Sequence, residues 1–271
     1  MSDIEKVKKL REATGAGFKD CNLAIKESNG DLDKAIEILR VKGISKASKK
    51  MSREAKEGVV VVSGDDTKTS VIEVNCETDF VAKNEDFINI ANNILDKAIS
   101  EDLASSEGLN ELTLDEGISV AEKVLEQTGV IGEKIEVSAQ VIEAVQVSSY
   151  VHAGNRLATL VGFNNVVDHQ VARDIAMQVA AMNPIAVDKE GVDQETIDRE
   201  LEIAKDLARQ EGKPEDMLEK IALGRLNKFF KENTLLNQAF IKDGKKSVAQ
   251  YLKDHGDDLS VTCFKRVGLS N

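Results

Sequence analysis

Apolar residues recur at intervals of three and four within residues 1–44, the pattern of short helices that each bury one face. Members of this pattern are Ile4, Val7, Leu10, Cys21, Ala24, Ile25, Leu32, Ala35, Ile36 and Leu39. Glycines interrupt the pattern at residues 15–17 and at Gly30, and glycine tolerates the backbone angles that end helices. The sequence therefore predicts a three-helix N-terminal module over residues 1–44.

Downstream, the apolar pattern changes to the alternation and short runs that are typical of β-strands, followed each time by a helical stretch. Predicted strands are 58–63, 69–76, 136–144, 145–151 and 156–163, and predicted helices are 84–100, about 114–128 with a break at Thr128-Gly129, and 167–182. The order strand, turn, strand, helix thus occurs twice. We expect an α+β fold whose core consists of two related antiparallel sheet-plus-helix subdomains.

Residues 193–231 carry a narrower apolar seam with polar outer faces. Its first half places Ile197, Leu201, Ala204 and Ala208 at spacings of four and three, and Gly212-Lys213-Pro214 ends it. Such a seam is typical of a coiled-coil-like pair of helices. We expect an antiparallel helical hairpin that projects from the body, and a final strand at 259–267 that closes the second sheet.

These elements suggest a domain organisation in four parts. The parts are the module at 1–44, a basic linker at 45–56, a core subdomain at 57–144, and a second core subdomain at 145–271 that carries the hairpin as an insertion at about 193–231.

Charge and cysteine content narrow the function. The chain has 271 residues and a formal net charge of −12, which argues against a general nucleic-acid binder or adhesion to anionic lipid. Its three cysteines are far apart, and no His, Cys or carboxylate spacing indicates a zinc site or a catalytic constellation. We expect a cytoplasmic binding or regulatory protein without a cofactor; the oligomeric state stays open.

Residues 40–56 are rich in Lys and Arg. This stretch is interpreted either as an electrostatic guide toward an acidic partner or RNA, or as a solvated helical linker. Charge runs usually face water, which favours the linker.

The stretch 73–83 is the most informative one. A β-rich run ends at Cys76, and Thr78-Asp79 favours a turn or a helix start because both side chains accept bonds from free backbone N–H groups. Phe80 and Val81 then stand at a strand-to-helix corner. From its position alone, Phe80 either folds back into its own core or projects as an aromatic anchor for a partner.

Two motifs carry a resemblance to a known family. Glu73-Val74-Asn75-Cys76 followed by Thr78-Asp79-Phe80-Val81 resembles the signature of the bacterial elongation factor Ts family, and residues 10–21 resemble its amino-terminal signature. The resemblance covers nearly the whole chain. It implies a ubiquitin-associated-like fold for the N-terminal module and a factor that promotes release of GDP from elongation factor Tu.

The resemblance also implies site residues. Phe80 is expected to wedge between two helices of the partner's GTPase domain and to disturb its Mg²⁺ and phosphate site, with Thr78, Asp79 and Val81 shaping the corner. Asp79 could also be a helix cap, and the two roles are possible together. Further contacts with the partner are expected from His152, Phe18 and Lys19. His152 could instead be a turn histidine with no role, and Phe18 could instead be a core residue. Asn22 stands where relatives carry a lysine, which puts an ion pair there in doubt.

Three rival functions stay open at this point. The first is an adaptor that binds peptides through residues 1–44 and has no exchange activity. The second is a thiol enzyme that uses Cys76, although a cysteine in an apolar strand is more often a packing residue. The third is an RNA chaperone that works through residues 40–56.

Overall fold

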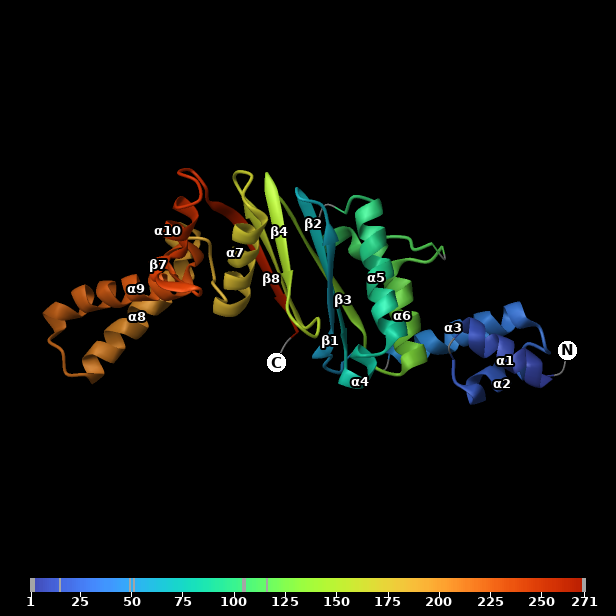
Figure 1. Cartoon of the computed structure of the whole chain (residues 1–271). Helices are drawn as coiled ribbons and strands as arrows, with labels where there is room; N and C mark the ends of the chain where they lie inside the picture. The colour runs from blue at the N-terminus through green and yellow to red at the C-terminus, as the bar shows by residue number, and fades with distance from the viewer. Residues whose placement is uncertain are drawn as a thin grey trace.

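The computed structural model describes residues 3–14, 16–48, 50, 52–103, 106–115 and 117–269, and every statement below concerns these residues. Three helices stand at the N-terminal end (Figure 1): α1 (Asp3–Thr14), α2 (Phe18–Glu27) and α3 (Leu32–Ser48). They bury a small cluster of their own that includes Leu10, Cys21 and Ile25. The helix α3 continues past residue 44, where the sequence suggested that the module ends.

Two three-stranded antiparallel sheets form the centre of the molecule. The first, in the order β1-β2-β3, consists of β1 (Glu57–Gly64), β2 (Lys68–Cys76) and β3 (Glu136–Glu143). The second, in the order β4-β5-β8, consists of β4 (Gln146–Val151), β5 (Leu157–Phe163) and β8 (Val261–Gly268). The final strand predicted at 259–267 is confirmed as β8, which pairs with β5.

The sheets pack against each other on one face and against helices on the other. Side chains of a strand alternate between its two faces. Val59 and Val61 therefore face the helices, while Val60 faces the second sheet and packs with Leu160. This double burial explains why β1 reads as a continuous apolar run rather than as an alternating one.

Helices cover the two outer faces of the sheets, which gives a helix-sheet-sheet-helix arrangement (Figure 1). The first sheet is covered by α5 (Glu85–Ser100) and α6 (Val120–Ile131), and the 3-10 helix η1 (Ser106–Glu111) lies between them in sequence. The second sheet is covered by α7 (His169–Met182).

The prediction for α6 was wrong at both ends. The helix begins at Val120, after a capping box in which Ser119 and Glu122 bond each other's backbone N–H groups. It runs through Thr128 and Gly129 and ends at Gly132, whose φ of 90° suits a glycine cap. Thr128 is fully buried, and its hydroxyl accepts a hydrogen bond from the N–H of Ile135 at 3.2 Å, so it belongs to the core rather than to a turn.

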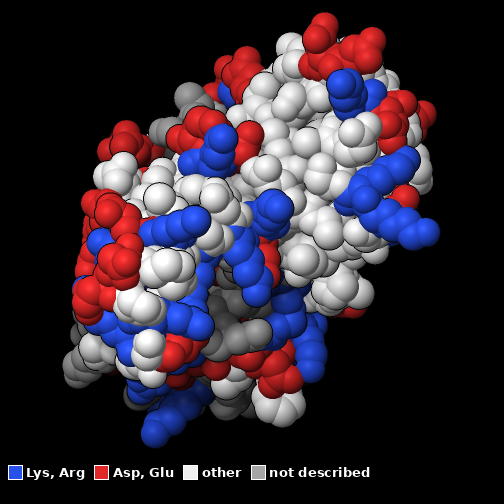
Figure 2. All heavy atoms as spheres, turned by 90° about the vertical axis from the view of Figure 1, so that its left-hand side faces the viewer, with Lys and Arg blue, Asp and Glu red and all other residues white. Residues whose placement is uncertain are grey.

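The helices α8 (Gln194–Gln210) and α9 (Leu218–Asn233) lie antiparallel and extend away from the sheets (Figure 1). Small side chains such as Ala208 and Ala222 are buried between them and allow a close approach. Figure 2 looks onto this end of the molecule, where acidic and basic side chains are interspersed rather than gathered by sign. The 3-10 helices η2 (Lys189–Gly191) and η3 (Glu215–Met217) precede α8 and α9.

Between α9 and β8 the chain forms a small subassembly. Its short helix is predicted by the apolar residues Val248 and Leu252, whereas its two strands are not predicted by the sequence. Its elements are η4 (Leu235–Asn237), β6 (Ala239–Phe240), β7 (Asp243–Ser247) and α10 (Val248–Lys253). The strand β7 is polar and almost wholly exposed, so no apolar pattern marks it. Phe240 anchors the subassembly by stacking on Tyr251 of α10, with ring centroids 4.0 Å apart.

Candidate functional site

The chain turns sharply where β2 ends. Thr78 is the N-cap of the single-turn helix α4 (Asp79–Ala82), and its hydroxyl accepts a hydrogen bond from the N–H of Val81 at 3.5 Å. Asn84 then caps α5 by accepting from the N–H of Asp86 at 2.8 Å. Two caps within seven residues thus fix a corner between strand and helix.

Phe80 projects from this corner into solvent, with 83% of its surface exposed. The inner face of α4 is occupied by Ala82, which is buried, and by Val81, which packs on the core of the first sheet. The interpretation that Phe80 folds into its own core is therefore wrong. Leaving such a side chain in water forgoes the roughly 1.5–3 kcal/mol that its burial would contribute. An exposed aromatic ring on an ordered turn is therefore a candidate contact for a partner.

Asp79 is not the helix cap. As the first residue of α4 it instead accepts a hydrogen bond from Lys83 Nζ at 2.6 Å, one turn further on. This bond holds the pKa of the Asp79 carboxyl below its usual range. Asp79 is therefore a carboxylate on the exposed side of the corner, beside Phe80.

The carboxylate of Glu133 holds the corner from the opposite segment. It accepts hydrogen bonds from the backbone N–H groups of Glu77 and Thr78 at 3.0 and 2.9 Å, and from the Thr78 hydroxyl at 2.6 Å. In return, Glu77 accepts from the backbone N–H of Lys134 at 2.6 Å. This last bond is the main reason why the pKa of Glu77 lies below its usual range.

Sequence reasoning missed Glu133. It lies 55 positions from Thr78, in the short segment between α6 and β3. No periodicity or motif points to a residue that acts across such a separation. The one local signal is its place directly after Gly132, the cap of α6.

The basic linker is bound to this corner rather than free in solvent. Arg53 pairs with Glu77 at 3.2 Å, and Lys50 Nζ donates to the carbonyl of Gly132. Three neighbouring cations form ion pairs as well: Arg40 with Glu122, Lys42 with Glu27 and Lys56 with Glu54. Lys49 and the side chain of Lys46 lie outside the described residues. Both interpretations of residues 40–56, as a guide for a partner and as a merely solvated linker, missed these contacts.

Cys76 is a packing residue at the end of β2. It is fully buried, and its thiol donates a weak hydrogen bond to the carbonyl of Thr78 at 3.2 Å. Burial, helped by the nearby charge of Glu133, raises the pKa of Cys76 to about 12. A thiol with such a pKa is not a nucleophile near neutrality, which argues against the thiol-enzyme hypothesis.

His152 lies in the exposed turn between β4 and β5, where its Nδ1 is 2.9 Å from the Tyr150 hydroxyl. The turn is tied to the start of β1 by a hydrogen bond from the N–H of Val60 to the carbonyl of Asn155, at 2.7 Å. The adjacent Arg156 pairs with Glu57 at the start of β1. Because Glu57 stands opposite Cys76 in the sheet, the structure brings the turn of His152 and the corner of Phe80 to the same end of the two sheets.

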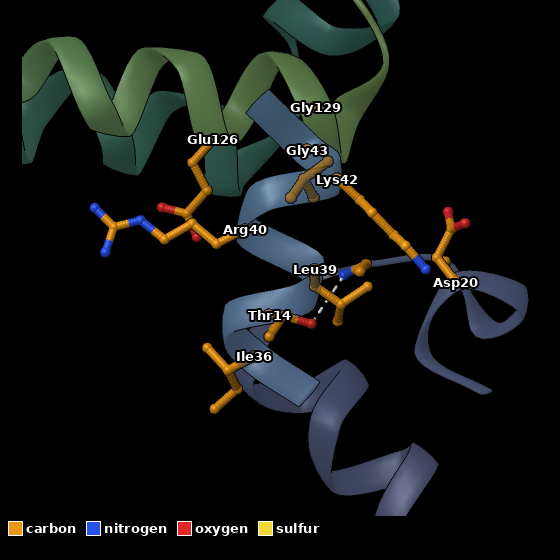
Figure 3. A pocket seen from close by; sticks show the side chains of 12 residues that line it. Thr14, Asp20, Ile36, Leu39, Arg40, Lys42, Gly43, Glu126 and Gly129 are labelled. Carbon is orange, nitrogen blue, oxygen red and sulfur yellow. Dashed lines mark hydrogen bonds between the residues drawn. The ribbon is translucent and has the colours of Figure 1, made fainter. Parts of the chain in front are cut away.

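The three predicted residues of α2 lie elsewhere. Phe18 and Lys19 are exposed at the start of α2 and Asn22 is half-buried, so Phe18 is not a core residue. In Figure 1, α3 and α6 stand between α2 and α4. A cleft lies where the module meets the core, lined among others by Leu39 and Gly43 of α3 and by Glu126 and Gly129 of α6 (Figure 3).

Two properties of the described ranges bear on chemistry. No group of three or more His, Cys, Asp or Glu side chains is placed there to hold a metal ion. None of the helices described is both long and apolar enough to cross a membrane. The distinctive feature is thus a surface one: an ordered corner that presents an aromatic ring.

Comparisons with known proteins agree with the motifs. The family model described as "Elongation factor TS" matches residues 77–271. An elongation factor Ts from Christiangramia forsetii is 53% identical over 269 residues, which is 97% of each chain. Proteins of the same name from Flavobacterium psychrophilum and Porphyromonas gingivalis are 49% and 47% identical and cover 97% and 98% of each chain.

These similarities place the chain among translation elongation factors of the nucleotide exchange class, which perform no bond chemistry. The chain belongs to the elongation factor Ts family. This family acts together with elongation factor Tu.

Proposed function

We propose that this protein binds elongation factor Tu in its GDP-bound form and accelerates release of the nucleotide. The observation that carries the proposal is the exposed ring of Phe80, held on a turn that is capped and bonded from both sides. Membership of the elongation factor Ts family supports the choice of partner. Free thiols at Cys21, Cys76 and Cys263 suit a reducing compartment and support action in the cytoplasm.

The mechanism follows from linkage between two ligands of one partner. A factor that accelerates release binds nucleotide-free elongation factor Tu more tightly than the GDP-bound form, and GDP then weakens the factor's binding to the same degree. The Phe80 ring is proposed to insert between two helices of the GTPase domain and to disturb its Mg²⁺ and phosphate site. Loss of the ion that bridges phosphate oxygens weakens the hold on the nucleotide.

Neighbouring residues have separate roles in this proposal. Thr78 sets the geometry of the corner through its cap. Val81 packs on the core but is only half-buried, and its exposed part is proposed to extend the apolar contact at the base of the ring. Asp79 offers a negative charge beside the ring, already balanced in the free protein by Lys83. The turn of His152 forms a second contact, since it lies at the same end of the sheets.

The N-terminal module is proposed as an additional contact. Phe18 presents an apolar side chain that is 54% exposed, next to Lys19. The proposal also includes three points about the architecture. The chain divides into four parts, at residues 1–44, 45–56, 57–144 and 145–271. The N-terminal module has a ubiquitin-associated-like fold, and the two core subdomains are related to each other. The two three-stranded antiparallel sheets with their helices support the last point.

A direct assay tests the function. Elongation factor Tu loaded with a fluorescent GDP derivative is mixed with excess unlabelled GDP and increasing amounts of this protein, and the loss of fluorescence is followed. The proposal expects a saturable increase in the release rate. An unchanged rate at saturating protein would refute it, and binding of a ligand by residues 1–44 with no exchange would favour the peptide adaptor instead.

A further inference from the structure

The corner that presents Phe80 is too short to hold its own shape. The helix α4 has four residues, whereas isolated helices need roughly 12–15 residues to be even marginally stable in water. Phe80 is exposed and adds no packing of its own. The order of this turn comes from the packing of Val81 and Ala82 on the core of the first sheet and from groups outside the turn.

Among the outside groups, Glu133 makes three hydrogen bonds to the corner. Its Oε2 accepts from the N–H groups of Glu77 and Thr78, and its Oε1 accepts from the Thr78 hydroxyl. Hydrogen bonds to an ionised acceptor are about twice as strong as neutral ones. One carboxylate thus fixes both the backbone entering the corner and the cap of α4.

The Thr78 hydroxyl passes this restraint on to α4. It donates to Glu133 and accepts from the N–H of Val81, so it joins the carboxylate to the first turn of the helix. Phe80 lies between Thr78 and Val81 in sequence. The backbone position from which the ring projects is therefore restrained by a chain of bonds that begins at Glu133.

Glu133 itself stands on a rigid support. It directly follows Gly132, the left-handed cap of α6, whose carbonyl is bound by Lys50. The next residue, Lys134, is nearly buried, and its N–H binds the carboxylate of Glu77. The segments 77–78 and 133–134 thus exchange hydrogen bonds in both directions, and Arg53 of the linker forms an ion pair with Glu77.

We propose that Glu133 is a positioning residue for nucleotide exchange: it holds the Thr78 corner so that Phe80 meets its partner already oriented. Pre-organisation of this kind lowers the entropic cost of ordering a group on binding. The proposal rests on the proposed exchange function and adds to it a residue outside the Thr78–Val81 motif.

Three substitutions test the role of Glu133 in the full-length protein. Glu133→Ala removes all three bonds and is expected to lower the maximal stimulated rate of GDP release about tenfold, the effect of one charge-assisted hydrogen bond. The half-saturating concentration is expected to change less, because the other contacts remain. Glu133→Gln keeps an oxygen for the two N–H groups and is expected to give an intermediate rate. Thr78→Val removes only the hydroxyl link and is expected to lower the maximal stimulated rate severalfold.

Asp65 offers a matched control at the opposite end of β2. Its carboxylate also accepts two backbone N–H bonds and a threonine hydroxyl, from Thr67 and Lys68. Asp65→Ala removes the same set of bonds from a turn that does not carry Phe80. Its release rate is expected to equal that of the wild type.

A double substitution separates positioning from general destabilisation. If Glu133 acts through Phe80, Glu133→Ala has no further effect in a Phe80→Ala background. The positioning role of Glu133 is overturned if Glu133→Ala stimulates GDP release as strongly as Asp65→Ala does. It is also overturned if Glu133→Ala lowers the stimulated rate by the same factor with and without Phe80. Should Glu133→Ala fail to fold by circular dichroism, Glu133→Gln and Thr78→Val decide by the same comparison. Failure of the exchange function would instead appear as an inactive wild type or a fully active Phe80→Ala.

Discussion

Gly43 of α3 and Gly129 of α6 meet backbone to backbone (Figure 3). A Cβ built on Gly129 would lie 2.6 Å from the Cα of Gly43, whereas one built on Gly43 would lie 3.9 Å from the Cα of Gly129. The first distance is a clash with rigid backbone, and the second is an ordinary contact. The crossing that joins the N-terminal module to the core therefore depends on one glycine more than on the other.

Gly129→Ala is expected to destabilise this junction by about 1–3 kcal/mol, the usual cost of overpacking. The measurement is urea unfolding together with limited tryptic cleavage after Arg53 and Lys56, which should become faster. Gly43→Ala is the matched control and is expected to have a much smaller effect. Equal unfolding and cleavage for both variants would contradict the assigned contact.

Gly224→Ala is a glycine substitution that is expected to raise stability rather than lower it. This glycine lies inside α9, and a Cβ there would meet no atom within 4 Å. Since glycine in a helix interior is destabilising by about 0.5–1 kcal/mol relative to alanine, the substitution is expected to stabilise the protein by that amount. A loss of thermal stability would contradict the open space around Gly224.

Asp174 makes stability depend on pH. Burial alone would raise the pKa of this carboxyl, but hydrogen bonds from Lys242, Gln170 and Tyr251 outweigh burial and lower the pKa. A depressed pKa in the folded state stabilises the protein above the ordinary value of 3.8, and this contribution is lost as the pH falls below it. Asp174→Asn is expected to cost about 2 kcal/mol at pH 7 and much less at pH 3.

Urea unfolding at the two pH values measures this difference. Asp254→Asn provides the control, because Asp254 pairs with Lys246 on the surface, where ion pairs contribute little. If the effect of Asp174→Asn were the same at both pH values, the charged form of Asp174 would not be the stabilising one.

Cys76 is expected to resist alkylation in the folded protein. Its burial and its pKa of about 12 leave almost no thiolate at pH 8. Iodoacetamide labelling followed by mass spectrometry should modify the half-buried Cys263 first. Rapid labelling of Cys76, or loss of nucleotide release in Cys76→Ser despite normal folding, would revive the thiol-enzyme hypothesis.

Local patterns were enough to predict most elements but not their long-range contacts. Strands β1 and β2 and helix α5 lie within one or two residues of their predicted ranges because their apolar periods are clear. Gly129 was interpreted as a helix stop, since the sequence does not show that Gly43 packs against it. Polar β7 has no apolar period at all.

The site shows the same division. The exposed corner was one of two possibilities open to Phe80, and position in sequence could not decide between them. The contacts that define its surroundings, from Glu133 and Arg53, cross 55 and 24 positions of sequence. The charge pattern predicts that Arg53 belongs to a solvated linker. Only the folded structure shows that its partner is Glu77.

The most direct test of the account is the rate of GDP release from elongation factor Tu with Phe80→Ala. The variant is expected to keep wild-type stability and to lower the stimulated rate about 30-fold, which corresponds to roughly 2 kcal/mol for a truncated aromatic anchor. Val166→Ala is the control, because it shortens a side chain that precedes α7 and is 82% exposed. This variant is expected to leave the stimulated rate unchanged. Wild-type release by a folded Phe80→Ala protein would contradict the central claim.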